Sequence, residues 1–174
     1  MAFEPEVFRS KIISDIVIFK PSINHDSRGT IFTSYNKKIY DSYLPNNIVF
    51  NHDKFAESKQ NVLRGLHGDI KTWKLVTCIY GEIFQVAVDL RKGSSTYMKW
   101  DSWIINSNNQ IEILIPPNFV NGYYVMSKVA VFHYKLAYKG DYIDTKEQIV
   151  IKWNDPALGI KWPCTNPVLQ SRDK

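Results

Sequence analysis

The sequence is divided into short apolar segments that recur about every ten residues, with turn-forming residues between them. The segments are rich in Ile, Val, Phe, Tyr and Trp, which favour β-strands. Clusters such as PSINHDSRG and WNDPALG separate them and have the composition of turns. The predicted strands are residues 15–20, 29–35, 47–50, 61–67, 74–81, 82–90, 99–106, 110–116, 122–126, 130–138 and 148–153. This pattern predicts an all-β sandwich or barrel.

Helical periodicity is hard to find in the chain. Residues 4–12 and 36–44 are the two best candidates for helices, and both are short. The chain has 174 residues, enough to bury one core and too few for two ordinary domains. We therefore expect a single domain over residues 1–174, folded as a cupin-type jelly roll with short helices at its ends.

Charge and hydropathy restrict the partners of the protein. The formal net charge of +5 favours anionic ligands. The basic residues are scattered, with no run of five or more, so a phosphorylated small molecule is favoured over nucleic acid. No apolar run approaches the length of about 18 residues that a membrane helix needs. We expect no membrane partner, and a soluble, cytoplasmic protein.

The cysteines and histidines do not form a pattern typical of a metal site. Cys78 and Cys164 are far apart and lack C-x-x-C spacing, which argues against a zinc site or a disulfide framework. Cys78 lies in an apolar run and is predicted to be a small buried residue. Cupin metal sites usually contain H-x-H, whereas Asp69 occupies the second position after His67. We therefore expect no metal.

Polar residues interrupt three of the predicted strands. Arg64, His67, Lys74 and Tyr134 each stand in an apolar run, where an uncompensated polar side chain costs about 1–3 kcal/mol. A jelly roll can bind a ligand in the mouth between its two sheets. Arg64 and His67 are three residues apart, so a twist or bulge is needed to place both on one face. Together they predict a pocket for an anionic ligand, with a histidine that can transfer protons.

Each of these residues also has a purely structural interpretation. A histidine in a strand is commonly a hydrogen-bonded core residue, and Tyr134 can be one core aromatic among ten tyrosines. Lys74 can be a charge on an edge strand. Asp173 can be a frayed carboxylate near the end of the chain. The residue types alone do not decide between these interpretations.

A set of motifs occurs in order from about residue 15 to residue 174. They are DSRGTIFTSYN (26–36), VLRGLH (62–67), KLV (74–76), VAVDLRKGSST (86–96), IPPNFVNGY (115–123), YK (134–135), WNDP (153–156) and SRDK (171–174). Together they resemble the dTDP-4-dehydrorhamnose 3,5-epimerase family of sugar-nucleotide epimerases. The resemblance implies a cupin-type jelly roll, a homodimer, no cofactor or metal, and a nucleotide-diphosphate 4-keto sugar as substrate.

The resemblance assigns a chemical role to four residues. Epimerisation next to a ketone needs a base on one face, an acid on the other, and a cation at the carbonyl oxygen. His67 would be the base and Tyr134 the acid, which is protonated at its ordinary pKa near 10. Lys74 would stabilise the enolate oxygen at C4. Asp173 would orient the histidine and favour its protonated form.

Further residues are expected to bind the substrate. Arg28 and Arg64 would hold the diphosphate, because a planar guanidinium matches two phosphate oxygens. The other predicted contacts are Asn121, Thr33, His52 and Arg91. In the VDLR motif, Arg91 can instead pair with Asp89 and serve only the sheet.

The positions that face the nucleotide depart from the family pattern. Thr30, Ile31 and Thr33 stand where the family has two aromatic residues and a glutamate. Residues His52–Lys54 replace a Gln-acid-Asn pattern. Gln85 replaces an acidic residue, and Asn121 replaces a histidine. A site built for one base rejects another, because its buried polar groups go unpaired. The changes argue against thymidine and favour a GDP-linked 4-keto heptose of bacterial surface polysaccharide. The shortened stretch between His67 and Lys74 would leave room for a larger sugar.

Three functions are compatible with these residues. The first is an epimerase that inverts C3, C5 or both of a GDP-4-keto heptose or a dTDP-4-keto-6-deoxyhexose. The second is a 3,4-ketoisomerase on the same fold, which moves the keto group; such relatives generally lack the Tyr134 acid and an SRDK-type segment. The third is a catalytically silent cupin that only binds a sugar nucleotide, which the replacement at Asn121 keeps open.

Overall fold

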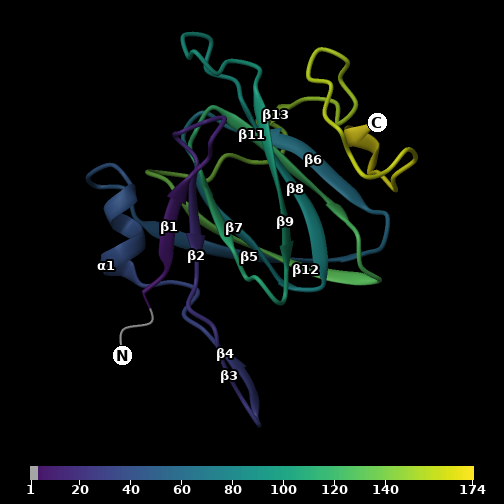
Figure 1. The fold of residues 1–174 in the computed structure, drawn as a ribbon. Helices are drawn as coiled ribbons and strands as arrows, with labels where there is room; N and C mark the ends of the chain where they lie inside the picture. The colour runs from purple at the N-terminus through teal and green to yellow at the C-terminus, as the bar shows by residue number, and fades with distance from the viewer. Residues whose placement is uncertain (1–3) are drawn as a thin grey trace.

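Antiparallel strands account for most of the regular structure in the computed structural model, which describes residues 4–174 (Figure 1). The six-stranded sheet has the order β1-β2-β10-β7-β12-β5, the five-stranded sheet has the order β13-β6-β11-β8-β9, and β3 and β4 form a separate hairpin. The strands are β1 (Glu6–Arg9), β2 (Val17–Lys20), β3 (Asn24–Asp26), β4 (Gly29–Ile31), β5 (Phe50–Lys59), β6 (Leu63–Gly68), β7 (Trp73–Tyr80), β8 (Glu82–Asp89), β9 (Trp100–Asn106), β10 (Glu112–Ile115), β11 (Phe119–Val125), β12 (Val129–Ala137) and β13 (Ile149–Val150). The predicted all-β jelly roll is confirmed.

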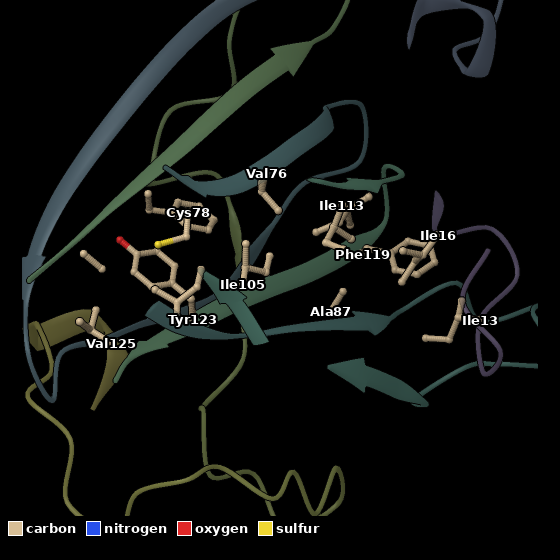
Figure 2. Packing of buried hydrophobic residues seen from close by; sticks show 14 residues of the cluster. Ile13, Ile16, Val76, Cys78, Ala87, Ile105, Ile113, Phe119, Tyr123 and Val125 are labelled. Carbon is tan, nitrogen blue, oxygen red and sulfur yellow. The ribbon is translucent and has the colours of Figure 1, made fainter. Parts of the chain in front are cut away.

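The main core lies between the two large sheets (Figure 2). Val76 and Cys78 of β7 pack with Ile113 of β10 from one sheet, and Ala87 and Tyr123 come from the other. Alternate residues of a strand point to opposite faces, so these strands bury one face against each other. Cys78 is a free, fully buried thiol, as predicted.

Smaller clusters cover the outer faces of the sheets. The short helix α1 (Lys37–Tyr40) and the 3-10 helix η1 (Asp41–Tyr43) pack on one end of the six-stranded sheet. Residues of the 149–162 segment cover Val86 and Val88 on the five-stranded sheet. These layers cover outer faces of the sheets, whereas the pocket described below lies between the two sheets.

The two helix predictions had different outcomes. Residues 36–44 are helical, and Asn36 accepts a hydrogen bond from the backbone N–H of Lys38 as an N-cap. The prediction of a helix at residues 4–12 was wrong, because β1 pairs with β2 there. A short isolated helix is marginally stable, whereas a strand at this edge gains backbone hydrogen bonds with its neighbour. No helix among residues 4–174 is long and apolar enough to cross a membrane.

Strand β5 differs most from its predicted bounds. Sequence patterning ended this strand at residue 50, but β5 begins at Phe50 and continues to Lys59 through the polar segment FNHDKFAESK. β5 is the edge strand beside β12, and most of its side chains are exposed. An edge strand can hold charged residues on its solvent side, which hides the apolar pattern by which strands are recognised.

A buried tyrosine–carboxyl pair joins α1 to the six-stranded sheet. Tyr40 Oη donates a hydrogen bond of 2.5 Å to Oε2 of Glu112, and both side chains are almost completely buried. Burial raises the pKa of Glu112 to about 8, although the bond from Tyr40 and the Lys135 ammonium act in the opposite direction. Glu112 therefore keeps its proton in the folded protein at a pH where it loses it in the unfolded chain.

Stability should depend on pH through Glu112. Between its ordinary pKa of 4.5 and about 8, the folded state binds a proton that the unfolded state releases, so stability falls as pH rises. We expect the melting temperature to fall between about pH 5 and about pH 8, and this fall to flatten in Glu112→Gln. Glu147→Gln, at an exposed position, should keep the wild-type slope. An unchanged slope in Glu112→Gln would contradict this assignment. Scanning calorimetry at several pH values measures it.

Candidate active site

A pocket of about 230 Å³ opens between the two sheets at one end of the sandwich. From the five-stranded sheet, β6 supplies Arg64 and His67, and β11 supplies Asn121. From the facing six-stranded sheet, β7 supplies Lys74 and β12 supplies Tyr134. Five of the predicted functional residues, far apart in the sequence, therefore line one cavity.

An irregularity in β6 places Arg64 and His67 on the same wall. His67 pairs with Asn121 and Arg64 pairs with Tyr123, so three steps along β6 match two along β11. Gly65 lies inside this bulge with a φ of +131°, and a Cβ there would collide with the backbone of Gly122. The bulge predicted from the spacing of Arg64 and His67 is confirmed.

His67 is held by a buried carboxylate. Its Nε2 lies 2.6 Å from Oδ1 of Asp173, on the 3-10 helix η2 (Ser171–Asp173), and the Asp173 side chain is fully buried. Burial lowers the pKa of His67 and the Asp173 carboxylate raises it, with a net lowering. A neutral histidine paired with a carboxylate can accept a proton. The interpretation of Asp173 as a frayed end was wrong.

Lys74 lies beside the histidine with its ammonium fixed. Nζ donates to the carbonyl oxygen of His67 and to Oδ1 of Asn121, each at 2.9 Å. Burial lowers the pKa of Lys74 to about 8, and the Asp69 carboxylate raises it. An ammonium has three N–H bonds, and residues 4–174 supply acceptors for two of them. The remaining N–H can stabilise a negatively charged oxygen of a ligand.

Tyr134 faces the histidine wall from the opposite sheet. Burial raises the pKa of Tyr134, and the neighbouring Tyr123 adds to this effect. The phenol therefore stays protonated at neutral pH and can donate a proton or a hydrogen bond. A proton acceptor on one wall and a donor on the other fit the inversion of a carbon held between them.

The structure does not bring two of the predicted substrate contacts, Arg28 and Thr33, to the pocket within one chain. Arg28 is on the β3–β4 hairpin, its side chain is 88% exposed, and it pairs with Asp26 at 2.6 Å. Thr33 follows β4 and lies outside the residues that line the pocket. The hairpin projects away from the two large sheets (Figure 1), which explains both positions.

Arg91 is occupied elsewhere, so its prediction as a substrate contact is not supported. Its guanidinium lies 2.7 Å from the buried carboxylate of Asp89 and 2.8 Å from Asp15. The hydrogen bonds from Arg91 and Thr96 hold the pKa of Asp89 well below its usual range, although burial opposes this. A buried carboxylate needs such a partner, and these contacts agree with the alternative in which Arg91 serves the sheet.

His52 lies near the pocket but behind another side chain. Its Nδ1 is 3.1 Å from Oη of Tyr138, and its ring centroid is 5.0 Å from that of Tyr142, which lines the cavity. Arg64, by contrast, lines the cavity directly, and its Nε donates to Oγ of Ser58 at 3.0 Å.

The pocket contains residues that the sequence analysis missed. They include Tyr142, Thr145, Gln148 and Arg172. Arg172 could have been found because it directly precedes Asp173 in the SRDK motif. Lys54, which the sequence analysis named only as a departure from the family pattern, also lines the pocket. Among residues 4–174, no group of three or more His, Cys, Asp or Glu side chains is placed to hold a metal ion.

Comparison with known proteins assigns the chain and its fold to a family. A family model described as dTDP-4-dehydrorhamnose 3,5-epimerase matches residues 10–174. The chain belongs to this family. A dTDP-4-dehydrorhamnose 3,5-epimerase from Salmonella typhimurium is 38% identical over 165 residues, which cover 92% of this chain and 88% of that protein. The epimerase family is a class of isomerases, so this protein is an enzyme.

Solved structures of other family members resemble this one closely. The 3,5-epimerase of Legionella pneumophila, in complex with dTDP-4-keto-L-rhamnose, superimposes with a TM-score of 0.89 at 35% identity. The alignment covers 98% of this chain and 90% of that one. A Bacillus anthracis dTDP-4-dehydrorhamnose 3,5-epimerase with TDP and PPi bound gives a TM-score of 0.87 at 30% identity, covering 97% and 96% of the two chains. The epimerase described here therefore has the family jelly roll over nearly its whole length.

Replacing Asp173 should impair His67 without unfolding this epimerase. Asp173→Asn keeps the side-chain shape but removes the charge that raises the pKa of His67. We expect turnover to fall by about 100-fold or more. The acid limb of the kcat/KM profile should also move to lower pH, because the pKa of His67 in the free enzyme falls further.

The matched control is Asp141→Asn, which removes an exposed carboxylate and should leave both quantities unchanged. An Asp173→Asn enzyme with wild-type turnover and pH profile would show that the pair with His67 is only structural.

Proposed function

We propose that this epimerase inverts C3, C5 or both of a nucleotide-diphosphate-linked 4-keto sugar through an enolate. The observation that carries the proposal is the pair of facing walls, with His67–Asp173 on one and Tyr134 on the other. Lys74 belongs to the same sheet as Tyr134, and its ammonium reaches across to the backbone carbonyl of His67, where it can stabilise a ligand oxygen. Nucleotide sugars of this kind serve bacterial surface polysaccharides.

The proposed reaction moves protons and leaves the oxidation state unchanged. His67 takes the proton from the carbon next to the ketone, and the electron pair moves onto the C4 oxygen, which the Lys74 ammonium stabilises. Tyr134 then donates its phenolic proton to the opposite face of that carbon. Solvent restores the proton to Tyr134 and removes the one on His67. No oxidant or cofactor is needed for this sequence.

The identity of the nucleotide has two candidates, each with its own support. The names of the relatives, and the complexes with dTDP-4-keto-L-rhamnose and TDP in two of them, favour a dTDP-4-keto-6-deoxyhexose. The changed residues at positions 30–33 and 52–54 favour another base, with GDP-4-keto heptose as the specific candidate. Lys54 supports the second, since its side chain lines the pocket where the family pattern has asparagine.

Deuterium wash-in tests the chemistry and the nucleotide together. In heavy water, we expect deuterium at C3 or C5 of the accepted sugar when dTDP-4-keto-6-deoxyglucose and a GDP-4-keto heptose are compared by mass spectrometry and proton NMR. His67→Asn should lose the exchange, by about 1,000-fold or more, because it removes the base. Exchange with neither sugar would contradict the proposed function.

Tyr134→Phe separates inversion from exchange. Without the phenol, His67 can still remove a proton and return a deuteron to the same face, so exchange should persist while inversion falls by at least about 100-fold. Tyr97→Phe, at a half-exposed tyrosine outside the pocket, is the control. A ketoisomerase would not require Tyr134, so a product with a relocated keto group, formed equally by Tyr134→Phe and wild type, would favour that alternative. NMR of the product sugar measures inversion.

We further propose that the enzyme is a homodimer in which each β3–β4 hairpin reaches the pocket of the partner. Arg28 is exposed, and it lies on a hairpin that extends away from its own pocket (Figure 1). If Arg28 binds the diphosphate, as the family resemblance implies, it can do so only in a second copy of the chain. In such a homodimer, Arg28 of one subunit would bind the diphosphate in the pocket of the other.

Mixed dimers test this arrangement. Arg28→Ala and His67→Asn should each have little or no activity when expressed alone. Co-expression of the two variants, which produces mixed dimers, should restore activity. In the mixed dimer, the subunit with intact His67 receives Arg28 from its partner, giving one complete pocket. No gain on mixing would show that Arg28 does not act across the dimer.

A further inference from the structure

Arg172 contacts the second nitrogen of the His67 ring, opposite the nitrogen that faces Asp173. Its Nη2 lies 2.8 Å from Nδ1 of His67, and its Nη1 donates to the backbone carbonyl of Thr145 at 3.0 Å. The side chain is 30% exposed and borders the pocket. The proposed epimerisation assigns no role to this arginine.

The contact with Arg172 determines which nitrogen of His67 carries the proton. A guanidinium has five N–H donors, no acceptor, and stays charged in proteins. Nδ1 of His67 must therefore accept the bond from Arg172, and Nε2 must carry the proton and donate it to Asp173. The lone pair of Nδ1 is the one with which a neutral His67 can take a proton, and Arg172 occupies it.

His67 cannot act as a base while this bond is made. Its lone pair is already used, and protonation would place an imidazolium 2.8 Å from a guanidinium. Burial lowers the pKa of His67, Asp173 raises it, and Arg172 and Lys74 lower it. The titratable and charged side chains around the ring are thus Arg172 and Asp173 of η2, Lys74 of β7, Arg64 of β6 and Tyr134 of β12.

Arg172 has a better partner available than an imidazole. A guanidinium binds phosphate with two parallel charge-assisted hydrogen bonds, which are stronger than bonds to neutral acceptors. Its Nε lies 3.9 Å from the carboxylate of Asp173, and its two hydrogen-bond partners, a ring nitrogen and a backbone carbonyl, are neutral. These two bonds are made by Nη1 and Nη2 and can be exchanged for bonds to phosphate oxygens at modest cost. Arg172 and Arg64 border the same cavity, so both can reach one anionic group.

We propose that Arg172 is a positioning residue that covers Nδ1 of His67 until a phosphoryl group of the substrate binds its guanidinium. Binding of the diphosphate then uncovers the base at the moment when the sugar is in place. The inference rests on the proposed function, because it takes the substrate to be a nucleotide-diphosphate sugar. It adds a coupling between phosphate binding and the proton acceptor.

The bond between Arg172 and His67 can be measured without turnover. In protein with 15N-labelled histidine, assigned with His67→Asn, the Nδ1 resonance of His67 should differ between the wild type and Arg172→Met, which removes the donor. The pKa of His67 should rise in Arg172→Met, because a neighbouring cation is lost. Lys174→Gln removes an exposed charge two residues away and should change neither quantity. Identical Nδ1 resonances in wild type and Arg172→Met would overturn the proposal.

Inorganic pyrophosphate tests the displacement. Adding it to the wild type should shift the Nδ1 resonance of His67 toward its position in Arg172→Met, and the same addition should shift the resonance of the variant little. A wild-type resonance that does not respond to pyrophosphate would overturn the proposal. Because this measurement uses no sugar, it stands even if neither 4-keto sugar nucleotide exchanges deuterium and the proposed function fails.

Kinetics separate this role from a purely structural one. With the accepted sugar nucleotide, Arg172→Met should raise KM by about tenfold through loss of a charge-assisted pair, while kcat stays within about twofold. Arg172→Lys should recover part of the lost affinity because it restores the charge. If Arg172 only held Asp173 in place, kcat would fall as in Asp173→Asn, and that result would overturn the proposal.

Discussion

The close approach of β6 and β11 at Gly65 and Gly122 determines which side chains reach the pocket. The two backbones meet where neither strand carries a Cβ, and the bulge that results turns Arg64 and His67 to the same side. A regular strand would have sent one of them into the core or into solvent. The same pairing sets Asn121 beside His67, from where it reaches Lys74. The close backbone contact between β6 and β11 therefore determines which polar side chains form this wall of the pocket.

Groups of both charge signs surround His67, and together with burial they set the pKa of its ring. Asp173 alone would favour a protonated imidazole, and the burial of the ring together with Arg172 and Lys74 opposes this. The outcome is a neutral ring of defined tautomer, which is the form a base requires. Similar effects act on Lys74: burial lowers its pKa, and the Asp69 carboxylate raises it. Burial therefore lowers the pKa of both groups, and a neighbouring carboxylate opposes this effect in each case.

Much of this architecture could be predicted from the residues, and the failures have physical causes. The strand pattern predicted the two-sheet sandwich. Strands buried on one face alternate between apolar and polar residues, and strands buried on both faces are continuously apolar. β1 and most of β5 were missed because edge strands depend on a single neighbour, which local composition does not reveal. His67, Lys74, Tyr134 and Asn121 were placed correctly from motifs, although their roles stay predictions. Arg91 was misplaced because the same guanidinium can serve a buried carboxylate or a ligand, and only the position of Asp89 decides between them.

The pair between His67 and Asp173 joins residues that are 106 positions apart in the chain. Such a contact forms only after most of the intervening sheet structure is in place, since closing so long a loop is entropically costly until other contacts bring its ends together. The buried pair that orients His67 is therefore expected to be among the last parts of the protein to form. A chain that is still folding, or one cut between β13 and η2, can carry both sheets and every other pocket residue of β6, β7 and β12 and still lack an oriented histidine. Activity in this enzyme thus reports that the whole polypeptide is intact and correctly folded, a stricter condition than the presence of the β-sandwich.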